Sequence, residues 1–389
     1  MTKPEDVPSQ ARSRPGLGWV FTGLLLAIFL ASLDQTIVAT ALPTVAGELH
    51  GLDHLYWVVA AYLLAATATT PLWGKISDLY SRKRIFQAAI VVFLVGSALC
   101  GASATLGQLV GFRALQGVGA GGLMALAMAI VADVVPPRDR GRYQGIIQSV
   151  FAIASVAGPL IGGALVDHAG WRWIFYVNLP VGVLALAVTS IALDLPARPA
   201  ERHIDFLGSA LMMAGVVALL LATTYGGNQY SWRSAQLISL LAAGVLLLAT
   251  FAFWETRARE PVLPLRLFRD RVFSVVSMTL FIASCSVFAA LVFLPLFLQM
   301  VTGASATESG LLLLPLVIGI AITATGSGWV ISALGRYKIF PVAGFALSAA
   351  GLGLMSLLTP SSGRAESSLY MTVFGLGFGM VTQVLIIAL

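Results

Sequence analysis

Two charged side chains lie inside long apolar segments of this chain, the carboxyl group of Asp34, which can bind and release a proton, and the guanidinium of Arg113. Asp34 is the only acidic residue deep in such a segment, about 14 Å along a helix from Pro43. An ionised carboxylate at that depth in a membrane costs about 2.5–3.5 kcal/mol, so we expect it to be protonated, paired or in contact with water. Arg113 lies about 8 Å into its own segment, counted from Gln108, and is the natural partner if the two helices face each other.

Such a pair can couple proton binding to a conformational change. Burial disfavours the charged carboxylate whereas the guanidinium favours it, so whatever separates the two groups changes proton occupancy. Two simpler interpretations stay open: Asp34 is a permanently neutral acid bonded to a neighbouring helix, or Arg113 extends its guanidinium to the outer interface. We also take Gln116 and Gln148 as candidates for lining a cavity, although hydrogen bonds between helices explain such residues equally well.

The elements that hold these side chains are predicted to be membrane-spanning helices. The chain has 389 residues, of which 58% are hydrophobic and only 10% charged, against roughly 45–50% and about 25% in soluble domains. Forty charged residues cannot cover the cores of a soluble enzyme of this length, which excludes that class (23 Lys and Arg, 17 Asp and Glu). Twelve apolar runs are long enough to cross a bilayer. We predict spans at residues 18–43, 55–74, 85–103, 107–133, 143–166, 173–193, 206–226, 235–254, 272–298, 309–333, 339–359 and 369–389.

The basic residues lie mostly in alternate loops between these spans. A cytoplasmic N-terminus places all of the 23 Lys and Arg on the cytoplasmic side except Arg172, Arg233, Arg364 and the intramembrane Arg113. This excess of positive charge on one side predicts a cytoplasmic N-terminus. The net charge of +6 then reflects membrane orientation, and we expect no nucleic-acid partner.

Other chemistries find no support in the sequence. The four histidines are predicted in loops, and there is no HExxH, GxSxG or P-loop pattern. Cys100 and Cys285 lie inside apolar segments and imply neither a disulfide nor a metal site. The stretch GVGAGG at 117–122 imitates a dinucleotide fingerprint, but no strand precedes it and it lies at membrane depth, so close helix packing explains it better. We expect no enzyme activity and no metal.

An internal repeat divides the chain. GKISDLYSRKRIF at 74–86 resembles GWVISALGRYKIF at 328–340, so the ninth span corresponds to the first, and the seventh and eighth spans are an insertion. A weaker match pairs glycines 117, 119 and 121 with glycines 375, 377 and 379. Equal halves would need two further spans, so we expect a truncated chain. The predicted parts are a cytoplasmic tail (1–17), an N-terminal six-helix bundle (18–193), a linker with two inserted spans (194–254), a cytoplasmic loop (255–271) and a partial C-terminal bundle (272–389).

Five motifs resemble those of the fourteen-spanner drug:proton antiporter family of the major facilitator superfamily. They are LDQTIVATALP at 33–43, GKISDLYSRKRIF at 74–86, GFRALQGVGAGG at 111–122, ASVAGPLIGG at 154–163 and FLPLFLQMVTGASATESGLLLLP at 293–315. The resemblance covers essentially the whole chain. Ser81 and Ala154 stand where the family usually has glycine, and both are small enough to preserve tight packing.

The resemblance implies an all-α integral membrane protein with the major facilitator fold, comprising a six-helix bundle, two inserted helices and an incomplete second bundle. It assigns proton coupling to Asp34 and Arg113. It also implies a cytoplasmic charge latch and an antiporter motif in the fifth span. The latch residues are Gly74, Asp78, Arg82, Asp133 and Arg142, and those of the antiporter motif are Gly158, Pro159, Gly162 and Gly163.

The resemblance further implies multidrug efflux across a bacterial-type plasma (inner) membrane. A monomer would export amphipathic, in some cases cationic, small molecules in exchange for protons, with the proton gradient as energy source and no cofactor. Two alternatives stay open. The same fold can export a native metabolite, a siderophore or a lipid, and a non-transporting membrane receptor or regulatory protein can bind a ligand without moving it.

Overall fold

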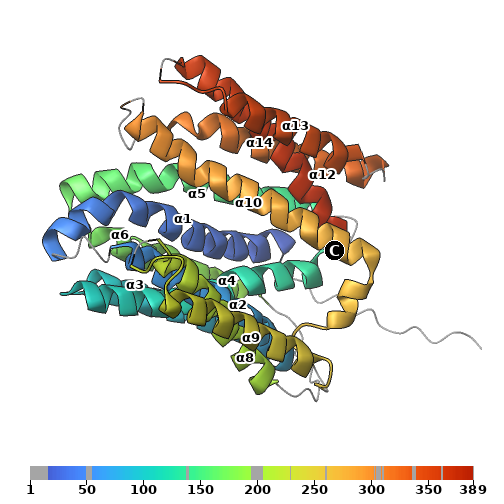
Figure 1. Cartoon of the computed structure of the whole chain (residues 1–389). Helices are drawn as coiled ribbons and strands as arrows, with labels where there is room; N and C mark the ends of the chain where they lie inside the picture. The colour runs from blue at the N-terminus through green and yellow to red at the C-terminus, as the bar shows by residue number, and fades with distance from the viewer. Residues whose placement is uncertain are drawn as a thin grey trace, which may run out of the picture.

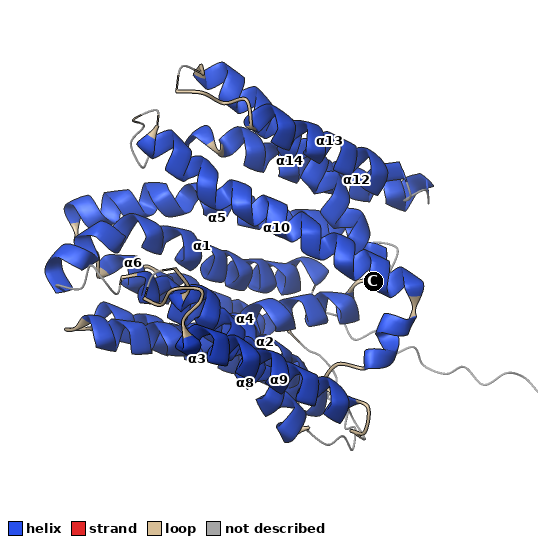
Figure 2. Ribbon diagram, in the orientation of Figure 1, coloured by secondary structure: helices blue, strands red, loops and turns tan. Residues whose placement is uncertain are grey.

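The chain folds into long helices. The computed structural model describes residues 16–49, 55–136, 140–193, 205–227, 229–258, 261–301, 311–334, 339–360 and 362–388, together with Gly303 and Glu308. Within these ranges Figure 2 shows helices and no strand. Among the described residues, ten helical segments are long and apolar enough to cross a membrane, and Ile339–Met355 is a shorter apolar helix.

The first six predicted spans form one group of helices. They are α1 (Leu17–Leu49), α2 (Tyr56–Leu79), α3 (Arg82–Gly101), α4 (Leu106–Val134), α5 (Arg140–His168) and the pair α6 (Trp173–Tyr176) and α7 (Asn178–Ala192). The predicted end of the first span at Pro43 was wrong, because α1 continues for six residues and buries Val45 beside Val58 and Trp171. The single predicted span 173–193 is interrupted at Val177, three residues before Pro180, whose ring removes a helical hydrogen bond.

The other six predicted spans also correspond to helices. They are α8 (Phe206–Tyr225), α9 (Ala235–Glu255), α10 (Arg271–Met300), α12 (Leu314–Leu334), α13 (Ile339–Met355) and α14 (Arg364–Ala388), with the short 3-10 helix η2 (Leu265–Arg269) before α10. Local side chains set several helix starts. Thr105, Asp205, Ser234 and Asp270 each accept a hydrogen bond from a backbone N–H in the first turn of α4, α8, α9 and α10.

The helices lie side by side in two groups with a pair on one flank (Figure 1). Helices α1 to α7 form the first group and α10 to α14 the second, and α5 packs against α12 where the groups meet. In the flanking pair, α8 packs against α2 and α9 packs against α8. We call the end where α2 and α4 finish the Arg82 end, and the opposite end, where Glu48 of α1 accepts a hydrogen bond from Trp171, the Trp171 end.

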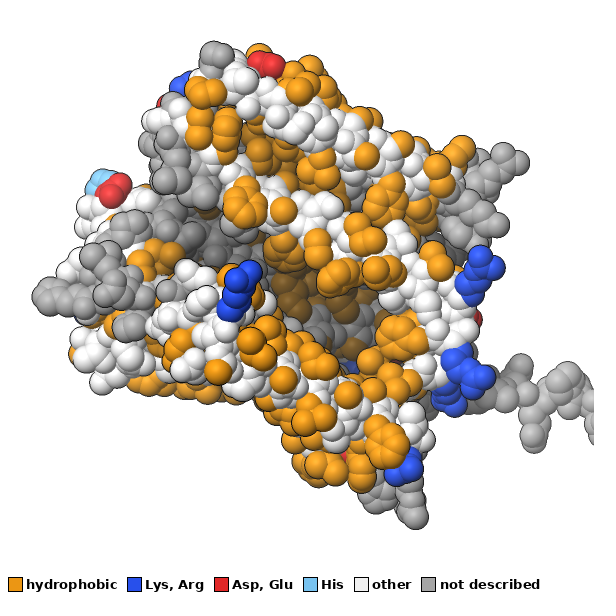
Figure 3. Space-filling model, in the orientation of Figure 1, with side chains coloured by type: hydrophobic (Ala, Val, Ile, Leu, Met, Phe, Trp, Pro, Cys, Tyr) orange, Lys and Arg blue, Asp and Glu red, His pale blue; other side chains and the backbone are white. Residues whose placement is uncertain are grey.

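The outer surface is suited to lipid. Large apolar side chains stand out from the helices, among them Ile191 at 83% exposure, Val342 at 73% and Phe206 at 72%. Figure 3 shows hydrophobic side chains over most of the visible face, with most of the Lys and Arg toward the end where η2 lies. Soluble proteins rarely expose apolar patches of this extent, so a bilayer is the solvent that covers them.

Glycines bring the helices of both groups into close contact in the same pattern. A Cβ at Gly117 of α4 would collide with the backbone of Tyr62 in α2, and one at Gly375 of α14 would collide with the backbone of Leu316 in α12. Gly119 similarly faces the backbone of Phe93 in α3, and Gly377 that of Ser348 in α13. The matching glycines of α4 and α14 therefore make corresponding contacts in the two groups of helices. In this correspondence Met371 and Phe374 of α14 occupy the places of Arg113 and Gln116 of α4.

We expect Gly117→Ala to destabilise the protein because the added methyl group forces α2 away from α4. Overpacking of this kind costs about 1–3 kcal/mol. Thermal unfolding in detergent should therefore start at a lower temperature. Gly111→Ala is the matched control on the same helix, since a Cβ there meets no atom within 4 Å and alanine favours the helix. Equal stability of the two variants would contradict this account of the packing.

Candidate functional site

The centre of the first group contains a buried carboxylate surrounded by hydrogen-bond donors. Asp34 of α1 has no exposed surface. Its Oδ2 accepts from Arg113 Nη1 at 2.6 Å, and its Oδ1 accepts from Gln116 Nε2 at 2.8 Å and from Asn178 Nδ2 at 2.9 Å. All three partners donate, so each carboxyl oxygen of Asp34 accepts at least one hydrogen bond.

Arg113 is held by contacts that do not depend on Asp34. Its Nε donates to the backbone oxygen of Val58 at 3.1 Å, and its Nη1 also donates to Gln116 Oε1 at 2.7 Å. The guanidinium lies over the ring of Tyr62, 4.1 Å from its centroid, and the ring of Phe175 is 5.9 Å away. Only 1% of Arg113 is exposed, so it does not extend to the membrane interface. Arg113 therefore keeps partners when Asp34 is neutral.

Close helix packing brings these side chains together. A Cβ at Gly96 of α3 would lie 2.6 Å from the Cα of Gln116, so the glycine lets α3 approach α4 at the level of the carboxylate. Ser97 and Cys100 of α3 then reach the same cluster, where Cys100 Sγ contacts Gln116 Oε1 at 3.7 Å. A larger residue at position 96 would separate α3 from α4, which carries Arg113 and Gln116.

Asn178 and Ser97 are members of the cluster that the sequence did not indicate. Asn178 begins α7 directly after the interruption at Val177, and its Nδ2 donates to Ser97 Oγ at 3.0 Å as well as to Asp34. Ser97 Oγ in turn donates to the backbone oxygen of Phe175 at 2.8 Å. The available signal was an amide side chain next to a Leu-Pro pair within an apolar run.

The antiporter motif packs α5 against α1 close to Asp34. Thr36 Oγ1 donates to the backbone oxygen of Ala154 at 3.0 Å, and a Cβ at Gly158 would collide with the Thr36 side chain. Pro159 follows within α5, and Gly162 is buried while Gly163 is half-buried. The motif thus ties the helix that carries Asp34 to the helix that meets the second group.

A second charge cluster lies at the Arg82 end. Arg82 forms ion pairs with Asp78 at 3.0 Å and with Asp133 at 2.5 Å, and its Nη1 also donates to the backbone oxygen of Ala129 at 2.8 Å. The structure thus brings three of the predicted latch residues together across the ends of α2 and α4. The Arg142 side chain lies outside the described residues, and a Cβ at Gly74 would meet no atom within 4 Å.

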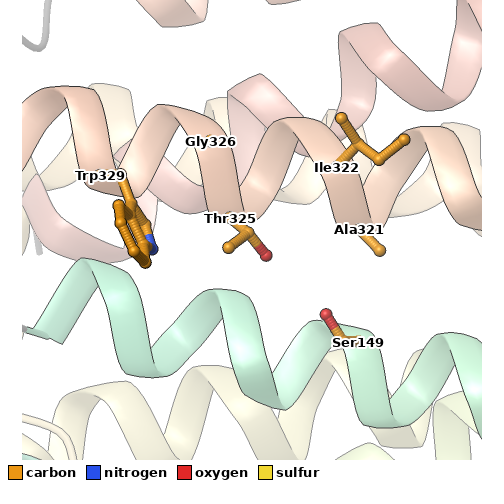
Figure 4. A pocket seen from close by; sticks show the side chains of 6 residues that line it. All are labelled: Ser149, Ala321, Ile322, Thr325, Gly326 and Trp329. Carbon is orange, nitrogen blue, oxygen red and sulfur yellow. The ribbon is translucent and has the colours of Figure 1, made fainter.

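The two residues predicted to line a cavity are Gln116 and Gln148, and the structure describes the side chain of Gln116 alone. Gln116 is fully buried and bonded to both Asp34 and Arg113, so in this conformation it does not line an open cavity. The Gln148 side chain lies outside the described residues. A depression of about 530 Å³ lies instead where α5 meets α12, with Ser149 facing Thr325 and Trp329 beside it (Figure 4).

We expect Arg113→Met to destabilise the protein strongly because a buried carboxylate is left without its cation. Breaking a buried ion pair from one side costs about 3–5 kcal/mol. The double variant Asp34→Asn with Arg113→Met leaves no buried charge and should unfold at a higher temperature than Arg113→Met alone. Thermal unfolding of the three variants in detergent measures this coupling, and additive losses would argue against a functional ion pair.

Comparison with known proteins matches the chain almost from end to end. The sequence profile of the Major Facilitator Superfamily matches residues 24–208 and 206–389. An uncharacterized MFS-type transporter of Mycobacterium tuberculosis is 44% identical over 368 residues, which are 95% of this chain and 54% of that protein. The chain thus spans about half the length of that relative. Multidrug transporter protein MdtP of Bacillus subtilis is 36% identical over 95% of this chain and 68% of its own length.

A solved structure shows the same fold. The proton:xylose symporter XylE bound to 6-bromo-6-deoxy-D-glucose superposes with a TM-score of 0.67 at 13% identity, covering 95% of this chain and 81% of that chain. Identity this low speaks for the fold alone. The profile matches and the shared helical architecture agree with each other. This chain belongs to the Major Facilitator Superfamily, and it is a multi-pass integral membrane protein rather than an enzyme.

Proposed function

We propose that this protein exports drug-like amphipathic small molecules in exchange for protons, with Asp34 as the proton carrier. The observation that carries the proposal is the fully buried Asp34 carboxylate paired with Arg113. Intramembrane ionisable residues are rare and mark proton or substrate pathways. The names of two relatives support the cargo class, MdtP and Multidrug resistance protein 3 of Bacillus subtilis, the latter 35% identical over 93% of this chain.

The proposed cycle alternates the access of Asp34 between the two sides of the membrane. A proton from outside binds the carboxylate, removes its charge and weakens its ion pair with Arg113, so the first group of helices can rock against the second. Arg113 stays in place because Val58, Gln116 and Tyr62 still hold it. The rearranged protein releases the proton to the cytoplasm and the cargo to the outside. In this conformation the carboxylate is closed off from solvent.

One proton supplies enough free energy for this exchange. A membrane potential near 100 mV contributes about 2.3 kcal/mol per charge, and each pH unit contributes about 1.4 kcal/mol. Together they sustain a cargo gradient of roughly a hundredfold or more. The proton gradient thus takes the place of a cofactor.

The orientation and the family subdivision belong to the same proposal. The Arg82 end faces the cytoplasm, since the basic loops gather there, and the membrane is a bacterial-type plasma membrane. Helices α8 and α9 are the pair inserted between two six-helix halves in a fourteen-spanner antiporter that works as a monomer. The Arg82 cluster with Asp78 and Asp133 acts as a latch that holds the outward-facing state.

We expect Asp34→Asn to abolish proton-coupled export because the amide cannot carry a proton between the two sides. Proteoliposomes containing the protein and a fluorescent cationic drug should show pH-driven flux that falls to the background of empty vesicles. Glu48→Gln is the matched control, since Glu48 is a half-exposed carboxylate at the Trp171 end of the same helix. Unchanged exchange by Asp34→Asn would refute the coupling role.

The same assay separates the alternatives. Saturable drug binding without pH-dependent flux would favour a receptor or regulatory protein. Proton-coupled flux of a metabolite, siderophore or lipid with none of the drugs would keep the mechanism and change the cargo.

We also expect a cross-link between α5 and α12 to stop transport, because it prevents the two groups from separating at the Arg82 end. Ser149→Cys with Thr325→Cys places thiols on facing residues for a short, reducible bis-thiosulfonate linker. Cys285 is exposed and is replaced by serine, whereas Cys100 is buried. Cross-linking should block flux and reduction should restore it, with each single-cysteine variant as control. Full transport in the linked protein would contradict rocking at this contact.

A further inference from the structure

We propose that Asn178 is a positioning residue whose hydrogen bond to Asp34 changes direction when Asp34 is protonated. Its side-chain amide donates to the carboxylate when Asp34 is charged. It turns to accept the acid O–H when Asp34 is protonated. The inference deepens the proposed exchange and rests on it, since it gives proton binding a mechanical consequence at the interruption between α6 and α7.

The first observation is an unused acceptor. Asn178 has no exposed surface, and its Nδ2 donates both to Asp34 and to Ser97. Its Oδ1 is buried and has no hydrogen-bond partner among the residues that the structure describes. Buried polar atoms are almost always satisfied, and leaving one without a partner is unfavourable. While Asp34 is charged, this oxygen can therefore accept a further hydrogen bond.

The second observation concerns the hydrogen-bond acceptor that a protonated Asp34 requires. Within the described part of the chain Asp34 is bonded only to donors, so a carboxylic acid at this position brings an O–H group with no acceptor among these partners. Gln116 Oε1 already accepts from Arg113 Nη1, which fixes the orientation of that amide. Among the side chains bonded to Asp34, only Asn178 offers a free oxygen.

Rotation of the Asn178 amide by half a turn supplies the acceptor. It exchanges the positions of Oδ1 and Nδ2, so Oδ1 faces the Asp34 O–H. Ser97 permits this rotation, because a hydroxyl can accept from Nδ2 or donate to Oδ1. When Ser97 donates to Asn178, it releases the backbone oxygen of Phe175, which it holds at 2.8 Å in this conformation.

The two states of this site differ in composition by one proton only. It arrives from water, binds an oxygen of the Asp34 carboxylate and leaves again to water, with no covalent bond between heavy atoms formed or broken. The consequence reaches α6 and α7 because Phe175 and Asn178 lie on either side of the break at Val177. Protonation thereby loosens the contact between α3 and the interrupted helix.

Three other titratable groups of the described residues face Asp34. Arg113 faces it from α4, Tyr62 from α2 and Cys100 from α3. The contacts that α5, α6 and α7 make with this region come from the Ala154 backbone, the Phe175 ring and Asn178, none of which titrates. A change in Asn178 that follows pH is therefore assigned by comparison with Asp34→Ser, which has no titratable side chain at position 34.

The chain allows a direct measurement because it contains only two asparagines, Asn178 and Asn228. Protein with ¹³C at the asparagine side-chain carbonyl is studied by infrared difference spectroscopy while the pH is lowered across the range in which it stays folded. We expect the labelled carbonyl band of Asn178 to move to lower wavenumber as the carboxylic acid band of Asp34 appears. The movement should persist in Asn228→Gln and vanish in Asp34→Ser, which removes the carboxyl group without adding a third labelled asparagine.

A pair of variants gives an independent readout. Gln116→Leu removes a donor that favours the charged form and should raise the pH at which Asp34 titrates by about one unit, the value of one hydrogen bond. Asn178→Leu removes a partner from both forms and should displace it by less than half as much. Equal displacement in both variants would show that Asn178 only donates and would overturn the inference.

The outcomes separate this inference from the proposed function. An Asp34 acid band that appears without any change at Asn178 overturns the inference and leaves proton exchange intact. A change at Asn178 without proton-driven flux overturns the exchange and leaves the amide response standing. An Asp34 that never protonates while the protein stays folded overturns both.

Discussion

The organisation of this protein depends on the cost of one ionised carboxylate in a medium that cannot solvate it. Asp34 remains tolerable because the protein replaces water with three directed donors, from Arg113, Gln116 and Asn178. Those donors come from two helices other than its own, and the ring of Tyr62 from a third helix covers the guanidinium. A change of one proton therefore alters the balance among several helices at once, which a surface carboxylate could not do.

Glycine makes this arrangement possible. Gly96, Gly117 and Gly119 each stand where a methyl group would strike a neighbouring backbone, so α2, α3 and α4 approach closely enough for short side chains to meet. Without a hydrophobic driving force between helices in lipid, such packing and the polar contacts it permits are the main sources of association. This close packing holds α2, α3 and α4 together around the carboxylate, whereas the first group meets the second through α5 and α12.

The sequence predicted the fold well because hydropathy reports directly on lipid contact, and each apolar run corresponds to a helix. It failed at helix boundaries, as at Pro43, where packing of Val45 extends α1, and at Val177, where the chain is interrupted before Pro180. The cost of a buried charge pointed to Asp34 and Arg113 as a pair. Uncharged Ser97 and Asn178 gave no such signal, because their importance depends on which neighbours the interrupted helix presents, and only three-dimensional packing determines that.

The repeat has a consequence for how such a protein can change over evolutionary time. Where α4 carries Arg113 and Gln116, the corresponding positions of α14 carry Met371 and Phe374. The duplicated scaffold therefore has buried polar side chains in one copy and buried apolar side chains in the other. Under the proposed exchange, substitutions in the apolar copy could alter which cargo the protein accepts without changing the residues that bind the proton. A fold built by duplication can thereby diversify its cargo in one half while the other half keeps the proton site.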